Sequence, residues 1–556
     1  MNHSNPAFGS ATHSADKLDD SPNTKYTFWD KLFIGWVSFL LLAIVVSQTF
    51  IRQVFEDSAL PNMITMGAIT ALIIACVSHP MLQKHWSPAW RFGPLVGLLL
   101  LFGLAAFLIE NIHFNNSMFP TPQWRWMERP VALEQDVKPS VAQAAVVAEQ
   151  RDPKFDYPQF LGIERRQVVR NVRLARDWKK TPPKEIWRKQ VGDGWSGFAV
   201  AGWNAVTLEQ LGDNETITCR DLKTGELVWT HSHPDVRHHV APGGLGPRST
   251  PTIDNDRVYT LGATGILDCL DLKSGKLQWT VDILDGDPLL IPEWGKACSP
   301  LIVGERVIVS AGEDEGRSLH AYDKTTGKLL WTGGDNFSSY ASPELQTLGG
   351  VPQILIVNQD FVDAHNPETG EVLWSFDWPG SSGSNANTAQ AFALDDGRVF
   401  VSKHYFVGSA VFNVTRDEQG KWNATKETVN GKTGWAKTVL RNKINNVSIR
   451  GGQAYGIDDT ILQCVDVDMG KIRWKGGRHG AGQIILVDDL LLVQSEDGNL
   501  VLVEATPERY VEVAKLPDVL HEEPCWNPPA LAAPYLVIRN WKEAVCLELP
   551  LEEEAK

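Results

Sequence analysis

Several features that point to familiar functions are scarce in this sequence. Seven cysteines occur in 556 residues, and none forms a Cys-x-x-Cys or Cys-x-x-x-Cys pair, so zinc-finger and dithiol sites are not expected. Basic residues are outnumbered, with 52 Lys and Arg against 67 Asp and Glu, and the net charge of −15 offers no broad surface for nucleic acid. A phosphate-binding loop, a dinucleotide fingerprint and a Ser-His-Asp constellation are also missing.

Long apolar runs are confined to the N-terminal end. Three uncharged runs cover about residues 32–51, 60–77 and 92–109, and each is long enough for a helix to cross about 30 Å of hydrocarbon. We predict a disordered cytoplasmic tail over 1–28 and a membrane anchor over 29–112 with three transmembrane helices, of which the second is the weakest. Lys and Arg are more frequent on the N-terminal side of the spans, so the chain after about residue 112 is expected outside the cytoplasm.

From residue 151 onward the sequence is typical of a β-rich domain, which follows a flexible, low-complexity linker over 113–150. Short runs of branched apolar residues alternate with Gly, Asp and Asn turns. One phrase recurs, first as CRDLKTGELVWT at 219–230: a small residue, Asp or Asn two positions later, a turn ending in Gly, and Trp four residues after the Gly. It predicts a strand, a tight turn and a second strand whose Trp packs on the neighbouring unit.

Five nearly complete copies of the phrase define a repeat. Their predicted blade-docking residues are Asp221, Gly225, Trp229, Asp271, Gly275, Trp279, Asp323, Gly327, Trp331, Asn366, Gly370, Trp374, Asp466, Gly470 and Trp474. Degenerate copies end at Trp422 and near residue 512, and a lone outer strand lies at Trp187, so eight outer strands are counted. Repeats of about 40–50 residues with four strands each predict an all-β, eight-bladed propeller over 151–556, closed by its N- and C-terminal strands.

The phrase resembles the tryptophan-docking motif of the PQQ-repeat (quinoprotein-alcohol-dehydrogenase-like) propeller superfamily. The stretches RDPKFDYPQFLG (151–162), GPRSTPTI (246–253) and CWNPPALAAPYLVIRN (525–540) are similar to those of bacterial membrane-anchored PQQ-binding-like propeller proteins. The resemblance covers roughly residues 155–549. It implies a bacterial inner-membrane protein with its propeller on the periplasmic side, but the motif itself holds blades together and carries no chemistry.

Function in a propeller usually sits at the mouths of the central channel, where chain segments lead into the innermost strands. Aligned on Ser-x-Pro, Arg248 and Trp526 take equivalent positions in two of these segments. The candidate ligand-binding residues are Arg248, Trp526, Lys296, Asn387, Asn446, His479 and Trp195. An Arg and a Trp across a channel suit an anionic, flat or sugar-like ligand. The alternative is that these side chains only bond and pack between blades.

A histidine-rich stretch, HSHPDVRHH at 231–239, contains metal-capable groups at close spacing. We expect it on a loop between two blades, with no regular element to fix its geometry. The weak metal candidates are His231, His233, His238 and His239, and a solvated loop without metal is the expectation.

Two functional classes follow from the resemblance. Quinoprotein dehydrogenases hold the quinone with a stacking Trp and a Ca²⁺ bound by Glu and Asn or Asp, and many add an adjacent Cys pair. This sequence has no Cys-Cys, and Glu293, Glu344 and Glu522 are isolated from suitable partners. The outer-membrane assembly-factor propellers instead bind a partner through loops. We favour a non-catalytic binding or scaffold module without cofactor or assigned catalytic residue. A PQQ- and calcium-dependent dehydrogenase of alcohols or sugars, and then a carbohydrate-related function, are the alternatives.

Overall fold

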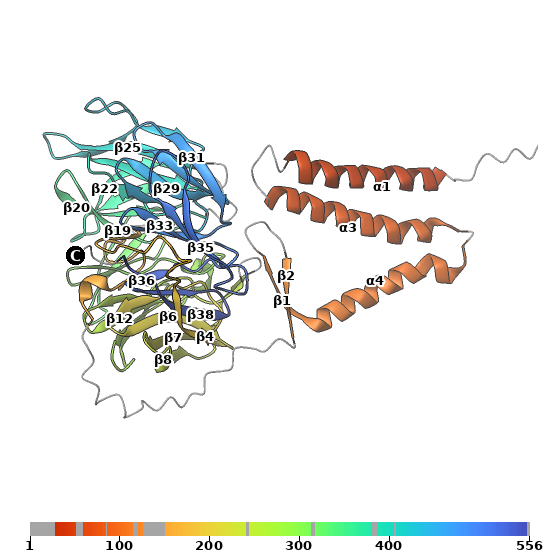
Figure 1. The fold of residues 1–556 in the computed structure, drawn as a ribbon, viewed down its shortest axis with the longest axis horizontal. Coiled ribbons are helices and arrows are strands. Elements are labelled where there is room, and N and C mark those ends of the chain that lie inside the picture. Colours follow the sequence, from red (N-terminus) through yellow and green to blue (C-terminus); the bar gives the residue numbers. More distant parts are fainter. Residues whose placement is uncertain are drawn as a thin grey trace, which may run out of the picture. The chain divides into compact units, whose positions relative to one another are not determined.

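The computed structural model describes nine stretches of the chain: residues 28–51, 59–84, 86–114, 120–125, 151–240, 244–312, 317–380, 386–404 and 407–552. The expected tail and most of the expected linker lie outside them. The chain divides into two compact units, one ending at Phe107 and one beginning at Leu108 (Figure 1).

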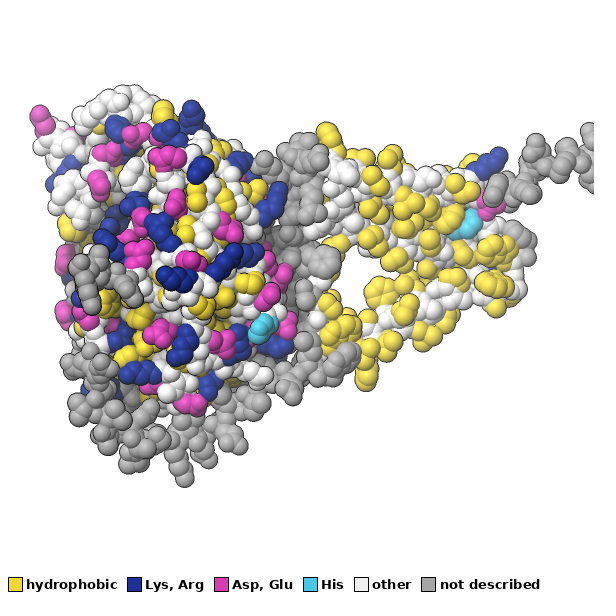
Figure 2. Space-filling view, viewed as in Figure 1, with side chains coloured by type: hydrophobic (Ala, Val, Ile, Leu, Met, Phe, Trp, Pro, Cys, Tyr) yellow, Lys and Arg dark blue, Asp and Glu magenta, His cyan; other side chains and the backbone are white. Residues whose placement is uncertain are grey.

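The N-terminal unit consists of three helices that match the three apolar runs. They are α1 (Phe28–Val46), which continues as a π-helical turn η1 (Ser47–Ile51), α3 (Ala59–Leu82) and α4 (Pro88–Leu108). Their mean hydropathies are 2.1, 1.9 and 2.0, and all three are long and apolar enough to cross a membrane. Apolar side chains cover the helices along their length (Figure 2). Three candidate spans are thereby confirmed, including the weakest of the predicted ones.

A short antiparallel hairpin follows the third helix. Its strands are β1 (Ile109–Phe114) and β2 (Pro120–Trp124). Regular structure therefore occupies the first part of the segment expected to be a flexible linker.

The rest of the chain is the predicted eight-bladed propeller, built from eight antiparallel sheets. Blade 1 contains β5 (Ala199–Ala201), β6 (Asn204–Leu211), β7 (Asn214–Asp221) and β8 (Leu227–His233), and blade 2 contains β11 (Thr252–Asp254), β12 (Arg257–Leu261), β13 (Ile266–Asp271) and β14 (Leu277–Asp282). Blade 3 contains β15 (Leu301–Val303), β16 (Arg306–Ser310), β17 (Leu319–Asp323) and β18 (Leu329–Gly333), and blade 4 contains β19 (Glu344–Leu348), β20 (Val351–Val357), β21 (Phe361–His365) and β22 (Val372–Asp377).

The second half of the ring has the same design. Blade 5 contains β23 (Phe392–Ala393), β24 (Arg398–Lys403), β25 (Gly408–Arg416), β26 (Trp422–Thr425) and β27 (Trp435–Lys437), and blade 6 contains β28 (Ser448–Arg450), β29 (Gln453–Asp458), β30 (Ile461–Asp466) and β31 (Lys471–Arg478). Blade 7 contains β32 (Gln483–Val487), β33 (Leu490–Gln494), β34 (Leu500–Glu504) and β35 (Glu512–Leu516), and blade 8 contains β36 (Ala530–Ala532), β37 (Tyr535–Arg539), β38 (Glu543–Glu548) and β4 (Lys184–Gln190).

Shorter elements complete the propeller domain. They are η3 (Pro153–Phe155), β3 (Val168–Val169), the pair β9 (His239–Val240) and β10 (Gly244–Leu245), and η4 (Pro288–Leu290). The ring closes as the sequence predicts, because β4 pairs with β38 and brings Trp187 opposite Cys546. Without β4, blade 8 would have three strands and expose the outer edge of β38, so the pairing covers that edge.

Tryptophans connect several neighbouring blades. The indole nitrogen of Trp229 donates to the carbonyl of Leu272 at 2.8 Å, and its ring lies against Gly275 in the turn of blade 2. Gly275 has φ +68°, and a Cβ there would lie 2.5 Å from the ring, so only glycine fits. Trp187, Trp279 and Trp331 face Gly225, Gly327 and Gly370 in the same way.

The degenerate copy in blade 5 differs from the regular ones. Trp422 lies on an outer strand, β26, as predicted, and packs in the core with blade 4. The indole that docks on blade 6 is that of Trp435, which pairs with Val411, lies against Gly470 and donates to the carbonyl of Val467 at 2.8 Å. The outer edge of this blade is split into two strands, and the docking tryptophan is on the second of them.

Candidate functional site

The central channel is occupied by the protein's own chain. Residues 151–169, here called the plug, precede the first blade and contact all eight. Listed from blade 8 through blades 1 to 7, the contacts are Arg151 with Ala533, Tyr157 with Val200, Pro158 with Ile253, Arg165 with Pro300, Arg165 with Glu344, Arg166 with Ala393, Gln167 with Ser448, and Val168 with Leu486. Three of the eight are backbone-to-backbone contacts and four use the side chains of Arg151, Arg165 and Arg166, so they left no periodic signal in the sequence.

The plug is anchored by one buried arginine. Arg165 and its partner Glu344 are 3% and 2% exposed, and their side chains meet at 3.3 Å. The guanidinium also donates to the carbonyls of Ser299, Pro300 and Pro343 at 3.1–3.2 Å. Burial raises the pKa of Glu344, and the charge of Arg165 opposes that shift. A buried cation with this many acceptors fixes the plug across blades 3 and 4.

At the opposite end of the inner strands lies the predicted channel mouth, where two tryptophans meet. The rings of Trp195 and Trp526 have centroids 4.9 Å apart at an angle of 42°. Asn527 holds their two segments together by donating to the carbonyls of Gly194 and Ser196 at 3.0 and 2.9 Å. The indole nitrogen of Trp526 donates to Glu496 at 2.9 Å. Blades 8 and 1 thus present a fixed aromatic pair.

Arg248 continues this surface from the neighbouring segment. The backbone N–H of Trp195 donates to the carbonyl of Pro247 at 2.8 Å, so the segment that carries Arg248 lies beside the segment that carries Trp195. Burial lowers the pKa of Arg248 to about 10, with Tyr340 opposing the shift, so the guanidinium stays protonated at neutral pH. Tyr340 pairs in turn with Trp294, with ring centroids 5.3 Å apart. Trp526, Trp195, Arg248, Tyr340 and Trp294 form a continuous series, here called the mouth arc.

The other predicted mouth residues serve inside the fold. Lys296 is 3% exposed and donates to the carbonyl of Ala311, and Asn387 is 1% exposed and donates to the carbonyls of Asn358 and Gln359. Asn446 accepts from the backbone N–H of Gln390 at 2.8 Å. His479 is 4% exposed, and burial lowers its pKa to about 4, so it is neutral at pH 7.

The Ser-x-Pro alignment has a structural meaning that sequence reasoning missed. The backbone N–H groups of Gly197, Thr250 and Ser299 donate to the hydroxyls of Thr250, Ser299 and Ser342 at 3.1, 2.9 and 2.9 Å. Each hydroxyl therefore connects its blade to the preceding one by a hydrogen bond next to the mouth. These hydrogen bonds explain why Ser or Thr recurs directly before the proline. Counted from that proline, Trp526 aligns with Ser249, so the predicted equivalence of Trp526 and Arg248 is wrong.

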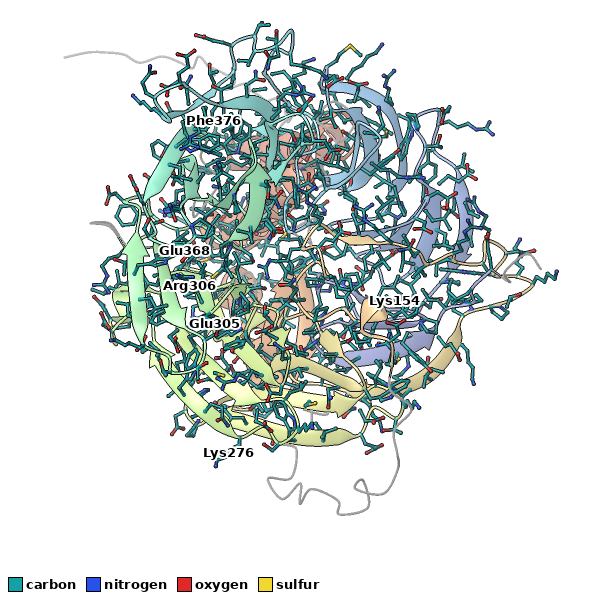
Figure 3. The ribbon with its side chains drawn as sticks, turned by 90° about the vertical axis from the view of Figure 1, so that its left-hand side faces the viewer. Lys154, Lys276, Glu305, Arg306, Glu368 and Phe376 are labelled. Atoms are coloured by element: carbon teal, nitrogen blue, oxygen red, sulfur yellow. The ribbon has the colours of Figure 1, made fainter. Side chains whose placement is uncertain are left out.

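The face that carries the turns after the inner strands has a groove of about 930 Å³. Figure 3 views the propeller from this face, with Lys154 of the plug region and the turn residues Arg306 and Glu368, an ion pair between blades 3 and 4. The cations lining the groove are Arg166, Arg170, Arg173, Arg176, Arg398, Lys432 and Arg450. Many are already paired: Arg398 with Asp396 at 2.7 Å, and Lys432 with Asp468 at 2.7 Å. In the run that follows the plug, Arg170 pairs with Glu164 of the plug at 2.6 Å, and Arg176 pairs with Glu504 of blade 7 at 2.9 Å.

The residues present do not fit a calcium-bound quinone. Of the three glutamates considered from the sequence, Glu344 is held by Arg165, Glu522 pairs with Lys542 at 3.0 Å, and Glu293 is exposed. Both carboxylate oxygens of Glu496 beside the mouth arc are also engaged, by Trp526 and by the backbone of Ala481. A calcium site needs several oxygen ligands that converge on one point, and these carboxylates do not provide it.

Comparison with known proteins agrees with the fold. Residues 213–476 match a family model described as outer membrane protein assembly factor BamB. No curated protein sequence matches the chain. Among solved structures, BamB from Moraxella catarrhalis is 12% identical with a TM-score of 0.47, and the match covers 66% of this chain and all of that one.

A dehydrogenase shares the same architecture. Quinohemoprotein alcohol dehydrogenase ADHIIG from Pseudomonas putida HK5 is 12% identical with a TM-score of 0.50, covering 72% of this chain and 81% of that one. The family match and the eight blades confirm the expected resemblance to PQQ-like propellers. Identity this low indicates a shared fold, and proteins of different function share it.

Proposed function

We propose that this chain is a non-catalytic binding module, tethered to the membrane, whose mouth arc binds a protein partner or a small ligand. The observation that carries the proposal is the plug, because the protein's own chain fills the channel and contacts every blade. A ligand would then approach the mouth arc from solvent. The similarity to an assembly-factor family model supports a binding role.

The chemistry of the mouth arc narrows the ligand class. Trp526 and Trp294 are partly exposed and can stack on a ligand, Trp195 and Tyr340 are buried against them, and Arg248 supplies a permanent positive charge. Aromatic rings and arginine are also the residues that dominate protein–protein hot spots. We therefore expect an anionic group carried next to a flat or aromatic one, either in a small molecule or in an extended loop of a partner. The acidic chain does not suit nucleic acid.

The proposed location is the periplasmic side of a bacterial inner membrane. Three apolar helices support anchoring, and the excess of Lys and Arg on the N-terminal side of the spans supports an outward-facing propeller. In spheroplasts, added protease should digest the propeller of a wild-type strain. Full protection of the propeller until the membrane is lysed would contradict this orientation.

The binding role is tested by site-specific photocrosslinking of the full chain in cells. A benzophenone amino acid at Trp526 should capture a partner or ligand, and Arg248→Ala should reduce the yield at least about tenfold, because a charge-assisted contact contributes roughly 1.5–3 kcal/mol. The same probe at Met469, which is 51% exposed in a turn of the opposite face, is the matched control.

The outcomes separate the two functional classes. Capture at position 526 that depends on Arg248, with none at 469, supports the proposal. Equal capture at both positions, or at neither, overturns it. Tight uptake of pyrroloquinoline quinone with Ca²⁺ by the purified full chain, with dye reduction by an alcohol or sugar, would establish the dehydrogenase alternative instead.

A further inference from the structure

Two histidines of the stretch 231–239 lie on a strand, contrary to the expectation of a loop. His231 and His233 are the last alternating residues of β8, so their side chains project from the same face of blade 1. Glu215 on β7 is directly opposite His233 and shares that face. The face looks toward blade 2, and the strand holds both imidazoles in fixed positions.

Blade 2 supplies a carboxylate to the same place. Asp268 on β13 is 1% exposed, and its Oδ2 lies 2.6 Å from Nε2 of His233. One potential ligand atom from each of His231, His233 and Asp268 lies within 4.8 Å of the others, and in the described part of the chain this is the one such group of three. Asp268 is 35 residues from His233 and on another blade, so no motif in the sequence indicates this neighbour.

The cluster has unused ligand atoms. Oδ1 of Asp268 and Nε2 of His231 are buried and have no hydrogen-bond partner. An unpartnered polar atom in such a position is costly, since burial removes its bonds to water. A bound cation would accept electron pairs from both atoms.

Negative charge at the cluster also lacks compensation. Glu215 is 2% exposed and accepts from the backbone N–H of Ala263 at 2.9 Å, with its carboxylate against Gly262, where a Cβ would lie 1.9 Å away. Across the described ranges, neither Glu215 nor Asp268 forms an ion pair with Lys or Arg, and His233 is the only cationic partner. Two buried carboxylates beside two imidazoles are a suitable setting for a divalent ion.

The equivalent position in blade 4 serves as an internal comparison. Asp363 corresponds to Asp268, and its oxygens accept from Asn336, Asn358 and Ser375 at 2.8, 2.7 and 2.5 Å. Asp363 is thus satisfied by neutral donors. In the other Trp copies, the positions two and four after the tryptophan hold no histidine. The scaffold therefore accepts an acid here without metal, and blade 1 alone adds the two imidazoles.

We propose that His231, His233 and Asp268 bind a divalent transition-metal ion of the zinc type in the interface between blades 1 and 2. Two imidazole nitrogens and one carboxylate match the donor preference of zinc, and three protein ligands leave a coordination position open to water. With bonds of about 2.0–2.2 Å, tetrahedral ligand atoms lie roughly 3.3 Å apart, so small side-chain rotations close the present cluster around an ion. Glu215 lies beside the ligands and balances the charge.

The two remaining histidines of the stretch are outside the site. Nε2 of His238 lies 3.1 Å from the carbonyl oxygen of Glu293, and His239 is exposed at the start of β9. They provide a control for nonspecific binding by the histidine-rich stretch, and Asp363 provides one for loss of a buried carboxylate at the same scaffold position.

The test is zinc titration of the full chain in detergent, purified without a histidine tag and stripped by chelator. Competition against a chromophoric chelator should show one zinc per chain with micromolar or tighter affinity. His233→Gln and Asp268→Asn should each weaken it at least about 100-fold, which corresponds to roughly 2.7 kcal/mol. The variants His238→Gln and Asp363→Asn should bind like the wild type.

A second readout guards against a folding defect. Thermal unfolding of the wild type should shift upward on adding zinc, and the shift should vanish in Asp268→Asn, a variant of nearly the same size as the native residue. If the wild type takes up no stoichiometric zinc, or if Asp268→Asn and His233→Gln bind as tightly as the wild type, the site does not exist. Equal weakening by His238→Gln would reduce the proposal to adventitious binding by the stretch and overturn it.

Discussion

Replacing Arg165 with alanine should detach the plug from the channel. The guanidinium donates to Glu344, to three backbone carbonyls and to Gln159, all at 3.1–3.3 Å. Arg165→Ala leaves the carboxylate of Glu344 with its donors Gln346 and Gln390 but without the buried cation, and removes one donor from each of three buried carbonyls. Removing one member of a buried ion pair costs about 3–5 kcal/mol, so we expect the free energy of unfolding to fall by that amount.

The loss should depend on pH in a defined direction. Burial already raises the pKa of Glu344 above its ordinary value of 4.5, and without Arg165 that pKa rises further. A group with a raised folded-state pKa contributes stability that is fully present below the unfolded pKa and is lost as pH rises through the folded one. The deficit of Arg165→Ala relative to the wild type should therefore be larger at pH 8 than at pH 5.

Denaturant unfolding of the full chain in detergent, followed by tryptophan fluorescence, measures both effects. In a Glu344→Gln background the pH dependence should disappear, since no carboxyl remains to titrate there. Limited trypsin digestion should at the same time cut the variant at Arg166 and leave the wild type intact. A loss below about 1 kcal/mol at pH 8, typical of an ordinary surface substitution, or an equal loss at both pH values would refute the account of a buried, charge-dependent anchor.

Two further predictions concern the blades themselves. Gly275→Ala should lower the free energy of unfolding by about 3 kcal/mol or more, because the alanine would have a left-handed backbone and would clash with Trp229. The control Gly202→Ala, at φ +57° with no atom within 4 Å, should lower it by only about 1–2 kcal/mol. Equal losses of the two variants in denaturant unfolding would contradict the docking role of Trp229. Burial lowers the pKa of His320 and His479 to about 4, so the unfolded chain binds more protons below about pH 6.5, and stability should fall between pH 6.5 and 4 by up to roughly 3 kcal/mol per histidine. Acid unfolding should become shallower in His479→Gln, and an unchanged slope would count against this assignment.

The propeller could be predicted because its signal is local and repeated. In each copy the turn glycine and the tryptophan lie within five residues of one another, and the same spacing recurs around the ring. The same logic did not identify Trp435, because blade 5 inserts extra residues before this docking indole. A spacing rule cannot distinguish two tryptophans when the turn between them changes length.

The plug and the mouth could be predicted only in part. Trp195, Trp526 and Arg248 were expected at one mouth, and the structure brings them into neighbouring segments. Lys296 was expected there too, but its position in the chain does not reveal that its ammonium turns inward to a carbonyl. The plug was not predicted, because its partners lie up to 382 residues away in the chain and many of them are backbone groups, which impose no pattern on side chains.

The side chains that differ most from blade to blade in this propeller lie in the interfaces between neighbouring blades, not in the central channel. The docking tryptophans repeat and the plug fills the channel, so the position on the third strand that faces the preceding blade is free to vary. It holds Thr218, Asp268, His320, Asp363 and Gln463 in successive regular blades, bound respectively to Glu209, His233, Tyr322, an amide network and Asp458. His320 also keeps a ring nitrogen without a hydrogen-bond partner, but of these five positions it is Asp268 whose unpartnered oxygen lies beside a second imidazole, that of His231. Because the scaffold tolerates five different side chains there, metal binding at Asp268 can be removed by mutation without dismantling the ring.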